Sequence, residues 1–192
     1  ELGGEGYALE VEQSRIDICA QEPAGLFYGC QTLRCLLPTA VFDKKAVTNK
    51  RWAIPCVYIE DKPRFGWRGL MLDCSRTFWS KEFIKRYIEL LALHKMNVLH
   101  LHLTDDQGWR VQIASYPKLT TAGRHFADKY NEPGGFYTKA DIREIVNHAA
   151  KHHVTVVPEI EMPGHCLAAL AAYPDLSCTG GPFEVYPFFK GP

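Results

Sequence analysis

Residues 97–109, with the sequence Asn97-Val-Leu-His-Leu-His-Leu-Thr-Asp-Asp-Gln-Gly-Trp109, decide the fold of this chain. Side chains alternate across a strand, so the leucines share one face and His100 and His102 share the other. This pattern favours a barrel strand, whose leucines meet an outer helix and whose histidines face the interior. Asp105 and Asp106 follow its C-terminal end, where barrel enzymes carry their catalytic groups.

Two further strand–helix patterns flank this stretch. Gly69–Asp73 is a continuous apolar run followed by a helix that Ser80 can cap, and Val154–Ile160 follows a helix that opens at Thr138 with an acid three residues later. Alternating strands and helices predict a parallel sheet with right-handed crossovers. A complete barrel needs about 250 residues. We therefore expect an α/β fold in which residues 63–192 hold the first three βα units of a (β/α)8 TIM barrel, or a small doubly wound sheet.

Residues 1–62 have a different organisation. Alternating residues within 1–21 predict a hairpin, and 24–37 predicts a helix whose apolar stripe is Leu26, Phe27, Cys30, Leu33, Leu36 and Leu37. A short strand over 54–59 follows. We interpret 1–62 as the C-terminal part of a small α+β domain that precedes the barrel, with the boundary at 61–64.

Composition excludes several functions. The chain has 22 basic and 22 acidic residues, so it lacks the basic footprint expected of a nucleic-acid partner. No apolar run is long enough for a membrane span. The seven cysteines contain no Cys-x-x-Cys pair, which favours small, half-buried free thiols over a zinc site or a disulfide framework.

Ionisable residues gather where the three predicted strands end. If these strands are neighbours, an arginine, several carboxylates and histidines meet at one edge, with aromatic rings as walls. Such a mixture, with little net charge, suits a neutral polyhydroxylated ligand, because guanidinium groups orient sugar hydroxyls and rings stack on sugar faces. These residues are Asp73, Arg76, His102, Asp105, Asp106, Glu159, Glu161 and His165, with Trp79, Trp109 and Phe136.

Other interpretations of the same residues stay open. Asp106 can be a solvated turn residue, and His100 can be a hydrogen-bonded core residue. The histidines at 94, 148, 152 and 153 lie on predicted helices and suit surface or packing positions. The spacing of His100 and His102 also suits two ligands of a divalent metal, which together with Asp105 and His165 would make a metal-dependent hydrolase.

Three motifs, in this order, resemble glycoside hydrolase family 20, the β-N-acetylhexosaminidases. They are Arg68-Gly-Leu-Met-Leu-Asp-Cys-Ser-Arg76, Leu99-His-Leu-His-Leu-Thr-Asp-Asp-Gln-Gly-Trp-Arg110 and Pro158-Glu-Ile-Glu-Met-Pro-Gly-His165. The resemblance implies removal of terminal N-acetylglucosamine or N-acetylgalactosamine with retained configuration. In this family the acetamido oxygen of the substrate attacks the anomeric carbon, an Asp steadies the acetamido group, and an adjacent Glu is the acid and base. No metal or cofactor is needed.

The resemblance also implies roles for individual residues. Arg76 matches the arginine that binds the 3- and 4-hydroxyls of the sugar, and Asp105 and His165 match a relay that supports the catalytic Glu. Glu161 occupies an acidic position before Pro-Gly-His, with a pocket role, and Trp109 is expected to contact the sugar. His102 and Asp106 are expected to support these residues from behind.

The chain departs from the family pattern at the catalytic pair. The dipeptide Asp-Glu occurs nowhere in the 192 residues. We therefore expect a fragment that binds N-acetylhexosamine-terminated glycans through part of a site, does not hydrolyse them alone, and pairs with the remainder of the barrel from a missing segment, a second chain or self-association. A non-catalytic sugar-binding fragment remains an alternative. The family suggests a secreted, periplasmic or lysosomal location.

Overall fold

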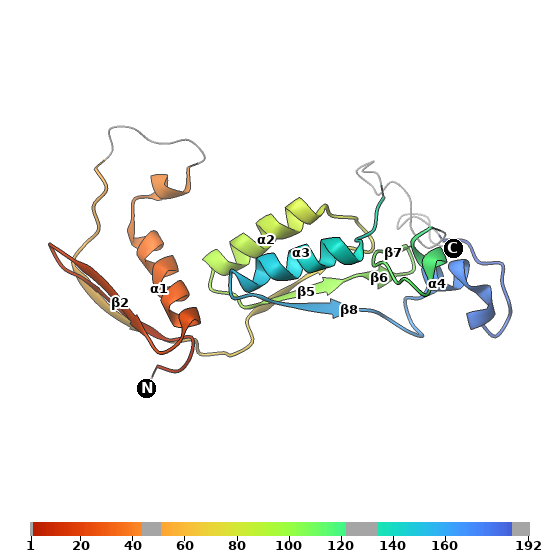
Figure 1. Ribbon diagram of the computed structural model, residues 1–192, viewed down its shortest axis with the longest axis horizontal. Coiled ribbons are helices and arrows are strands. Elements are labelled where there is room, and N and C mark those ends of the chain that lie inside the picture. Colours follow the sequence, from red (N-terminus) through yellow and green to blue (C-terminus); the bar gives the residue numbers. More distant parts are fainter. Residues whose placement is uncertain (1, 44–50, 122–133, 186–192) are drawn as a thin grey trace. The chain divides into compact units, whose positions relative to one another are not determined.

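The computed structural model describes residues 2–43, 51–121 and 134–185 (Figure 1). The chain divides into two compact units. The first comprises Glu1–Arg68 with Ala92–Met96, and the second comprises Gly69–Leu91 with Asn97–Pro192. Each unit has its own sheet.

The first unit is a small α+β structure. Strands β1 (Tyr7–Val11) and β2 (Ile16–Ala20) form the predicted antiparallel hairpin, and β3 (Val57–Asp61) pairs with the other edge of β1. The central strand alternates buried and half-buried residues, and its inward side chains Tyr7, Leu9 and Val11 form a core with Tyr28. A short 3-10 turn, Thr39–Phe42, follows the helix of this unit.

Helix α1 (Pro23–Leu36) confirms the predicted helix and part of its predicted apolar stripe, because Phe27, Leu33 and Leu36 pack against the core of this unit. Leu26 and Cys30 are exposed instead, and the fully buried positions are Gly25, Tyr28, Gly29 and Gln31. The two glycines are buried because α1 lies very close to the neighbouring chain at these positions. A Cβ at Gly25 would lie 2.2 Å from the Gly6 carbonyl oxygen, and one at Gly29 would lie 2.5 Å from the Ile18 side chain. A helix turns its glycines toward a neighbouring backbone when the two pack this closely.

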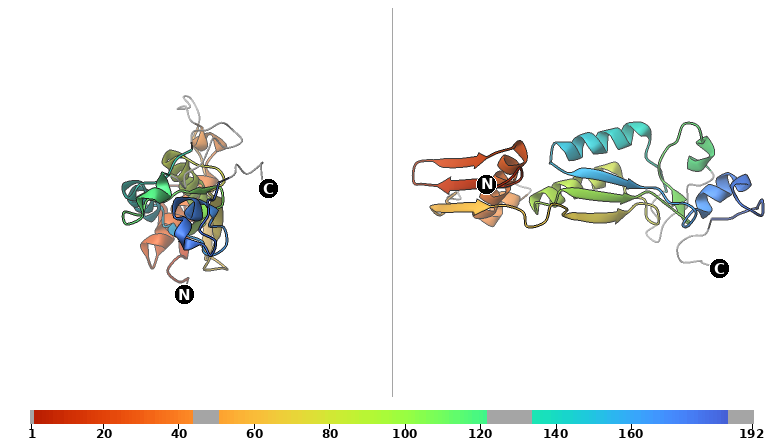
Figure 2. Two further views of the ribbon diagram at one scale, coloured as in Figure 1. Left: turned by 90° about the vertical axis from the view of Figure 1, so that its right-hand side faces the viewer. Right: turned by 90° about the horizontal axis from the view of Figure 1, so that it is seen from below.

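The second unit contains the predicted parallel sheet. Strands β4 (Gly69–Asp73), β5 (Val98–His102) and β8 (Thr155–Glu159) pair in the order β4-β5-β8, with both pairs parallel. Helices α2 (Lys81–Leu93) and α3 (Lys139–Ala150) connect them and lie on the same face of the sheet (Figures 1 and 2). The fold of this unit is therefore α/β, as the sequence predicted.

The register of the sheet places the ionisable side chains of the three strands on one face and the leucines of β5 on the other. Met71, His100 and Val157 are partners across the three strands, and Asp73, His102 and Glu159 are the next partners on the same face. The alternate residues place Leu99 and Leu101 on the opposite face, where both are buried. The predicted separation of leucines from imidazoles on the strand 98–102 is thus present.

Local sequence signals set the helix starts. The Ser80 hydroxyl accepts a hydrogen bond from the Phe83 backbone N–H, and Thr138 and Asp141 form a reciprocal capping box at α3. Ile84 and Ile88 of α2 and Ile145 of α3 are fully buried, whereas Val146 is 43% exposed.

Short elements extend the C-terminal ends of the strands. β6 (Thr104–Asp105) and β7 (Gly108–Trp109) form a tight antiparallel pair, followed by a 3-10 turn, Pro117–Thr120. Helix α4 (Leu167–Ala172) and a 3-10 turn, Pro174–Leu176, come after β8. Residues 122–133, which precede α3, lie outside the described residues.

The cysteines are free, as predicted, but their burial differs from the prediction. Cys19, Cys30, Cys35, Cys56 and Cys178 are exposed rather than half-buried, and Cys74 is fully buried. Burial raises the pKa of the Cys74 thiol to about 12, so this thiol is neutral. Within the described ranges, none of the helices has the length and apolarity that crossing a bilayer requires.

Candidate active site at the strand ends

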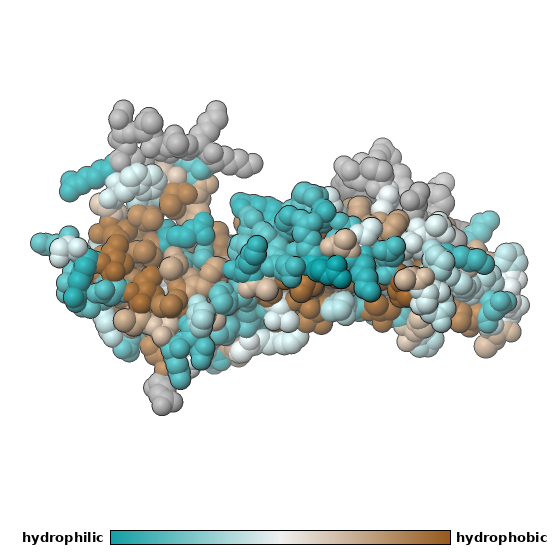
Figure 3. Space-filling view, viewed as in Figure 1, coloured by the Kyte–Doolittle hydropathy of each residue, from teal (hydrophilic) through white to brown (hydrophobic). Residues whose placement is uncertain are grey.

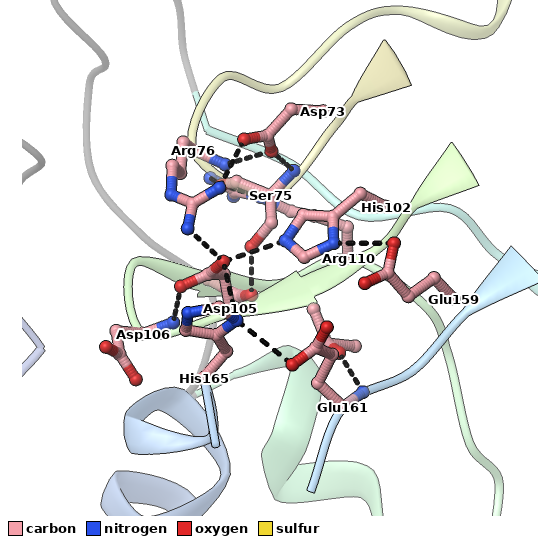
Figure 4. Close-up of polar contacts among 12 residues, drawn as sticks. Asp73, Ser75, Arg76, His102, Asp105, Asp106, Arg110, Glu159, Glu161 and His165 are labelled. Atoms are coloured by element: carbon pink, nitrogen blue, oxygen red, sulfur yellow. Dashed lines mark hydrogen bonds and ion pairs between the residues drawn. The ribbon is translucent and has the colours of Figure 1, made fainter. Parts of the chain in front are cut away.

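Asp105 is the centre of the polar residues at the C-terminal ends of the strands (Figure 4). It lies on β6, directly after β5, and only 1% of its side chain is exposed. Its Oδ2 atom lies 2.5 Å from Nη2 of Arg76 and 2.7 Å from Nε2 of His102. Its Oδ1 atom accepts a hydrogen bond from the Asp106 backbone N–H at 2.7 Å. These donors hold the buried carboxylate in one orientation.

Arg76 is fixed by two carboxylates but is not covered by them. Asp73, the last residue of β4, accepts hydrogen bonds through Oδ1 from the backbone N–H groups of Ser75 and Arg76, and through Oδ2 from Nη1 of Arg76 at 2.8 Å. The turn after β4 therefore aims the guanidinium at Asp105. A guanidinium has five N–H donors, and 30% of this side chain is exposed. It can therefore also donate to a ligand.

His102 bridges two carboxylates. Its Nε2 faces Asp105 at 2.7 Å and its Nδ1 faces Glu159 at 2.9 Å. Ionised carboxylates only accept hydrogen bonds, so a protonated ring can donate from both nitrogens, one to each carboxylate. Burial acts to lower the pKa of His102, but its hydrogen bonds to Glu159 and Asp105 outweigh burial and raise that pKa.

Glu159, at the end of β8, joins His102 to its neighbour on β5. Its Oε2 atom lies 2.6 Å from Nε2 of His100 as well as 2.9 Å from Nδ1 of His102. Side-chain hydrogen bonding with Glu161, and then with His102 and His100, lowers the pKa of Glu159 against the opposing effect of burial. His100 is therefore a hydrogen-bonded strand residue, as one of the two sequence interpretations expected.

His165 and Glu161 approach Asp105 from the segment after β8. Nδ1 of His165 lies 3.0 Å from Oε2 of Glu161 and 3.7 Å from Oδ2 of Asp105. The Glu161 backbone N–H donates to the Thr104 hydroxyl, and His165 adopts a positive φ of 50°. Nearly half of the His165 side chain is exposed. The structure thus brings the two predicted relay residues together, with Glu161 in the direct hydrogen bond to His165.

A layer of buried polar groups supports this arrangement. The Ser75 hydroxyl donates to the Gly108 carbonyl, and the Arg110 guanidinium donates to the carbonyls of Ser75 and Gly135. Asp106 accepts a hydrogen bond from the Leu167 backbone N–H at the start of α4. These bonds tie the turn after β4, the β6–β7 turn and α4 together, so the strand ends form a rigid base.

Trp109 does not occupy the position that the sequence predicted. It is only 2% exposed and packs with Leu119, Ala168, Ala169 and Ala172, while its indole N–H donates to the Val111 carbonyl. Because the ring is covered by α4, it supports the site from behind instead of presenting a face to a sugar. Trp79 also differs from the wall expected of it, because its ring stacks on Phe83 of α2 and its N–H donates to the Asp73 carbonyl.

The strand ends are a poor metal site despite their histidines. His102, Glu159 and Glu161 offer ligand atoms within 4.8 Å of one another. Both nitrogens of His102, however, already lie within hydrogen-bond distance of a carboxylate, at 2.7 and 2.9 Å. A metal would need a neutral imidazole lone pair, so it would have to displace one of these short hydrogen bonds.

Sequence reasoning underestimated two groups in this site. Glu159 has the central role of pairing with both histidines of β5, and strand register, which the sequence does not give directly, places it there. Arg110 is a fully buried cation that binds two loop carbonyls, and no local pattern distinguishes it from an exposed arginine. We call the group Asp73, Arg76, His102, Asp105, Glu159, Glu161 and His165 the strand-end cluster.

Family comparisons agree with both units. Residues 65–187 match the model of the glycosyl hydrolase family 20 catalytic domain, and residues 1–62 match that of domain 2 of the same family. The chain is 46% identical over 184 residues to a β-hexosaminidase of Porphyromonas gingivalis, covering 95% of this chain and 24% of that protein. It is 44% identical to a β-N-acetylhexosaminidase of Cellulomonas fimi, covering 96% and 36%.

Solved structures agree in fold as well as in sequence. The family 20 β-N-acetylhexosaminidase of Streptomyces coelicolor is 49% identical with a TM-score of 0.92, covering 99% of this chain and 38% of that one. A mutant Streptomyces plicatus β-hexosaminidase in complex with the product GlcNAc is 49% identical with a TM-score of 0.91, covering 98% and 37%. The chain spans well under half the length of these relatives. This chain belongs to glycosyl hydrolase family 20.

Proposed function

We propose that this chain supplies the hydroxyl-binding and relay part of the active site of a β-N-acetylhexosaminidase, which removes terminal N-acetylglucosamine or N-acetylgalactosamine from glycans. The observation that carries the proposal is the Arg76 guanidinium, held between Asp73 and Asp105 at the strand ends and still partly exposed. In this proposal residues 1–62 belong to the small domain that precedes the barrel, and residues 63–192 are the first three βα units of a TIM barrel.

Each residue of the strand-end cluster has a physical task in this proposal. Arg76 donates to adjacent sugar hydroxyls, because its planar fork matches two acceptors at once. Asp105 orients the donors around it, and His165 transmits its charge toward a catalytic acid. Glu161 holds Nδ1 of His165 at 3.0 Å. His102 lies between Asp105 and Glu159, so in its protonated form it reduces the repulsion between these two carboxylates.

The acid and base of the reaction come from residues outside these 192, because the adjacent Asp and Glu of the family do not occur in the sequence. In the family's reaction the acetamido oxygen bonds to the anomeric carbon while the glycosidic bond breaks, and the Glu gives its proton to the leaving oxygen. The residues present here bind and orient; none of them is placed as that proton donor. We therefore expect the purified chain to bind the sugar without turnover.

The test is turnover of a chromogenic N-acetyl-β-glucosaminide by the purified chain, with and without a chelator, beside a binding measurement with N-acetylglucosamine. We expect no release, and binding in the millimolar range that Arg76→Ala abolishes. Arg143→Ala is the matched control, because Arg143 is an exposed arginine of α3. Release that a chelator does not affect would contradict the assignment of the missing pair, and release that a chelator abolishes would favour the metal-dependent hydrolase.

A further inference from the structure

A second group of histidines and a carboxylate lies on the helices of the second unit, away from the strand ends. Glu89 is on the C-terminal half of α2, His148 is in the last turn of α3, and His152 is in the turn that follows. Each offers one ligand atom, and these three atoms lie within 4.8 Å of one another. All three side chains are partly buried. We call Glu89, His148 and His152 the interhelix cluster.

The spacing within this cluster is that of a coordination shell. Oε1 of Glu89 and Nε2 of His148 are 3.5 Å apart, too far for a good hydrogen bond. Two ligands of a tetrahedral ion with bonds of about 2.0–2.1 Å lie about 3.3 Å apart. The rings of His148 and His152 are neighbours, with centroids 4.5 Å apart. An ion between the three groups therefore needs only small side-chain rotations.

One buried ring nitrogen of the interhelix cluster makes no hydrogen bond to any of the described residues. This atom is Nε2 of His148. Buried polar atoms are nearly always paired, with protein, water or an ion. This nitrogen is also the atom of His148 that faces Oε1 of Glu89.

The orientation of His152 also suits a ligand. Its Nδ1 lies 2.9 Å from the His148 carbonyl oxygen. A carbonyl only accepts, so Nδ1 donates in this contact. Metal-binding histidines characteristically donate their other N–H to a carbonyl in this way, which fixes the ring. The turn is set by His153, whose φ is 54°, and by hydrogen bonds from His152 and Val154 to the Ala149 carbonyl.

Some charges around the interhelix cluster favour a bound cation and others oppose it. Oε2 of Glu89 accepts from Arg86 at 2.8 Å, and this bond chiefly lowers the pKa of Glu89, so the carboxylate is ionised. Lys85 acts against a bound cation, and Arg143 and Lys151 line the groove beside His148. Lys85 is itself neutralised by Glu144 at 2.7 Å. The C-terminal end of α3, with its partial negative charge, favours a cation at His148. Figure 3 shows that the surface over α2 and α3 is mostly hydrophilic.

We propose that Glu89, His148 and His152 bind a divalent transition-metal ion of the Zn²⁺ class between α2 and α3, with water completing the shell. Two imidazoles and one carboxylate are ligands that suit Zn²⁺, Cu²⁺ and Ni²⁺ rather than Ca²⁺ or Mg²⁺. The ion would cross-link the C-terminal ends of two neighbouring helices. The site does not depend on the proposed glycosidase activity, because it shares no residue with the strand-end cluster.

The test is calorimetric titration of Zn²⁺ into the 192-residue chain at pH 7.5, after alkylation of its exposed cysteines, which would otherwise compete. We expect one site whose affinity falls at least about tenfold in His148→Gln/His152→Gln. His94→Gln, an exposed histidine in the turn after α2, is the matched control and should bind unchanged. Unchanged binding by the double variant would overturn the proposal, as would loss of binding in Glu161→Gln with retention in the double variant, which would place the ion at the strand ends.

Two further measurements keep the test decisive if the double variant does not fold. Glu89→Gln changes one partly exposed group and should also weaken binding. In the unmodified chain, histidine side-chain NMR should show Zn²⁺ shifting the signals of His148 and His152 while those of His102 stay in place. Shifts confined to His102 and His165 would contradict the proposal. The affinity for Zn²⁺ should also fall as the pH drops below about 6.5, because protons compete for both imidazoles.

Discussion

The strand-end cluster and the interhelix cluster use the same side chains, histidine and carboxylate, with opposite electrostatics. At the strand ends the two ring nitrogens of His102 contact Asp105 and Glu159 at 2.7 and 2.9 Å, and the pKa of His102 is raised. Between the helices, Nε2 of His148 faces a carboxylate at 3.5 Å without a hydrogen bond, and its pKa is lowered. The number of partners, rather than the residue type, decides whether a buried histidine is a charged structural group or a neutral ligand.

Removal of Asp105 should give the largest effect on stability. Asp105→Ala would leave the Arg76 guanidinium and the His102 imidazolium without their shared buried partner, so we expect a loss of about 3 kcal/mol in the free energy of unfolding. Urea denaturation measures this loss. Asp175→Asn is the matched control at an exposed acid of the same unit, with an expected change within about 0.5 kcal/mol. A loss below 1 kcal/mol for Asp105→Ala would mean that the cluster is not held together by this carboxylate.

Glu159→Gln should give an intermediate effect. The amide keeps an acceptor for His102 but loses the charge, so we expect a loss of about 1–2 kcal/mol and a lower pKa for His102. Urea denaturation gives the first quantity, and an NMR titration of the His102 ring gives the second. If the pKa of His102 does not fall, Asp105 alone keeps the ring charged, and the paired-carboxylate explanation is wrong.

The two clusters should affect the pH dependence of stability in opposite ways: the contribution of His102 is lost at high pH, and that of His148 is lost at low pH. The raised pKa of His102 gives stability that is complete below the unfolded value of about 6.5 and is lost as pH rises through the native pKa. The lowered pKa of His148 gives stability that is complete above about 6.5 and is lost as pH falls through its native pKa. Urea denaturation between about pH 5 and pH 8 should show His102→Gln flattening the upper part of the profile and His148→Gln the lower part. If both variants changed the pH dependence of the free energy of unfolding in the same pH range, the predicted difference between His102 and His148 would be wrong.

The smallest effect is expected for Glu89→Gln in the absence of metal. Glu89 is partly exposed and its bond to Arg86 is a surface pair, so its loss should change the free energy of unfolding by less than about 1 kcal/mol. Thermal denaturation with and without Zn²⁺ should separate the metal from the pair: the wild-type chain should gain stability from the ion and the variant should gain less. An equal gain in both would show that Glu89 is not a ligand.

Sequence patterns predicted much of this fold and part of the site. The strand Gly69–Asp73, the capping box at Thr138 and Asp141, and the two faces of the strand 98–102 all follow from local alternation and capping chemistry. Arg76 and Asp105 were found because they directly follow strands. Local patterns suffice where one element determines its own geometry.

Tertiary packing decided the features that the sequence did not predict. The buried face of α1 follows its glycines because the helix approaches the Gly6 backbone, and Trp109 is covered by α4, which lies about sixty residues later in the chain. Glu159 meets His102 through strand register, and Glu89 meets His148 only because α2 and α3 are neighbours. A surface or packing position was the best expectation for His148 and His152 from helical periodicity alone.

Histidine side-chain NMR during a titration with N-acetylglucosamine tests the division between the two clusters most directly. A sugar bound through Arg76 should shift the signals of His102 or His165, through Asp105 and Glu161, and leave those of His148 and His152 unchanged. Arg76→Ala should abolish the shifts, and Arg143→Ala should not. Equal shifts in both clusters, or none at sugar concentrations well into the millimolar range, would contradict the assignment of the strand ends as the sugar-binding site.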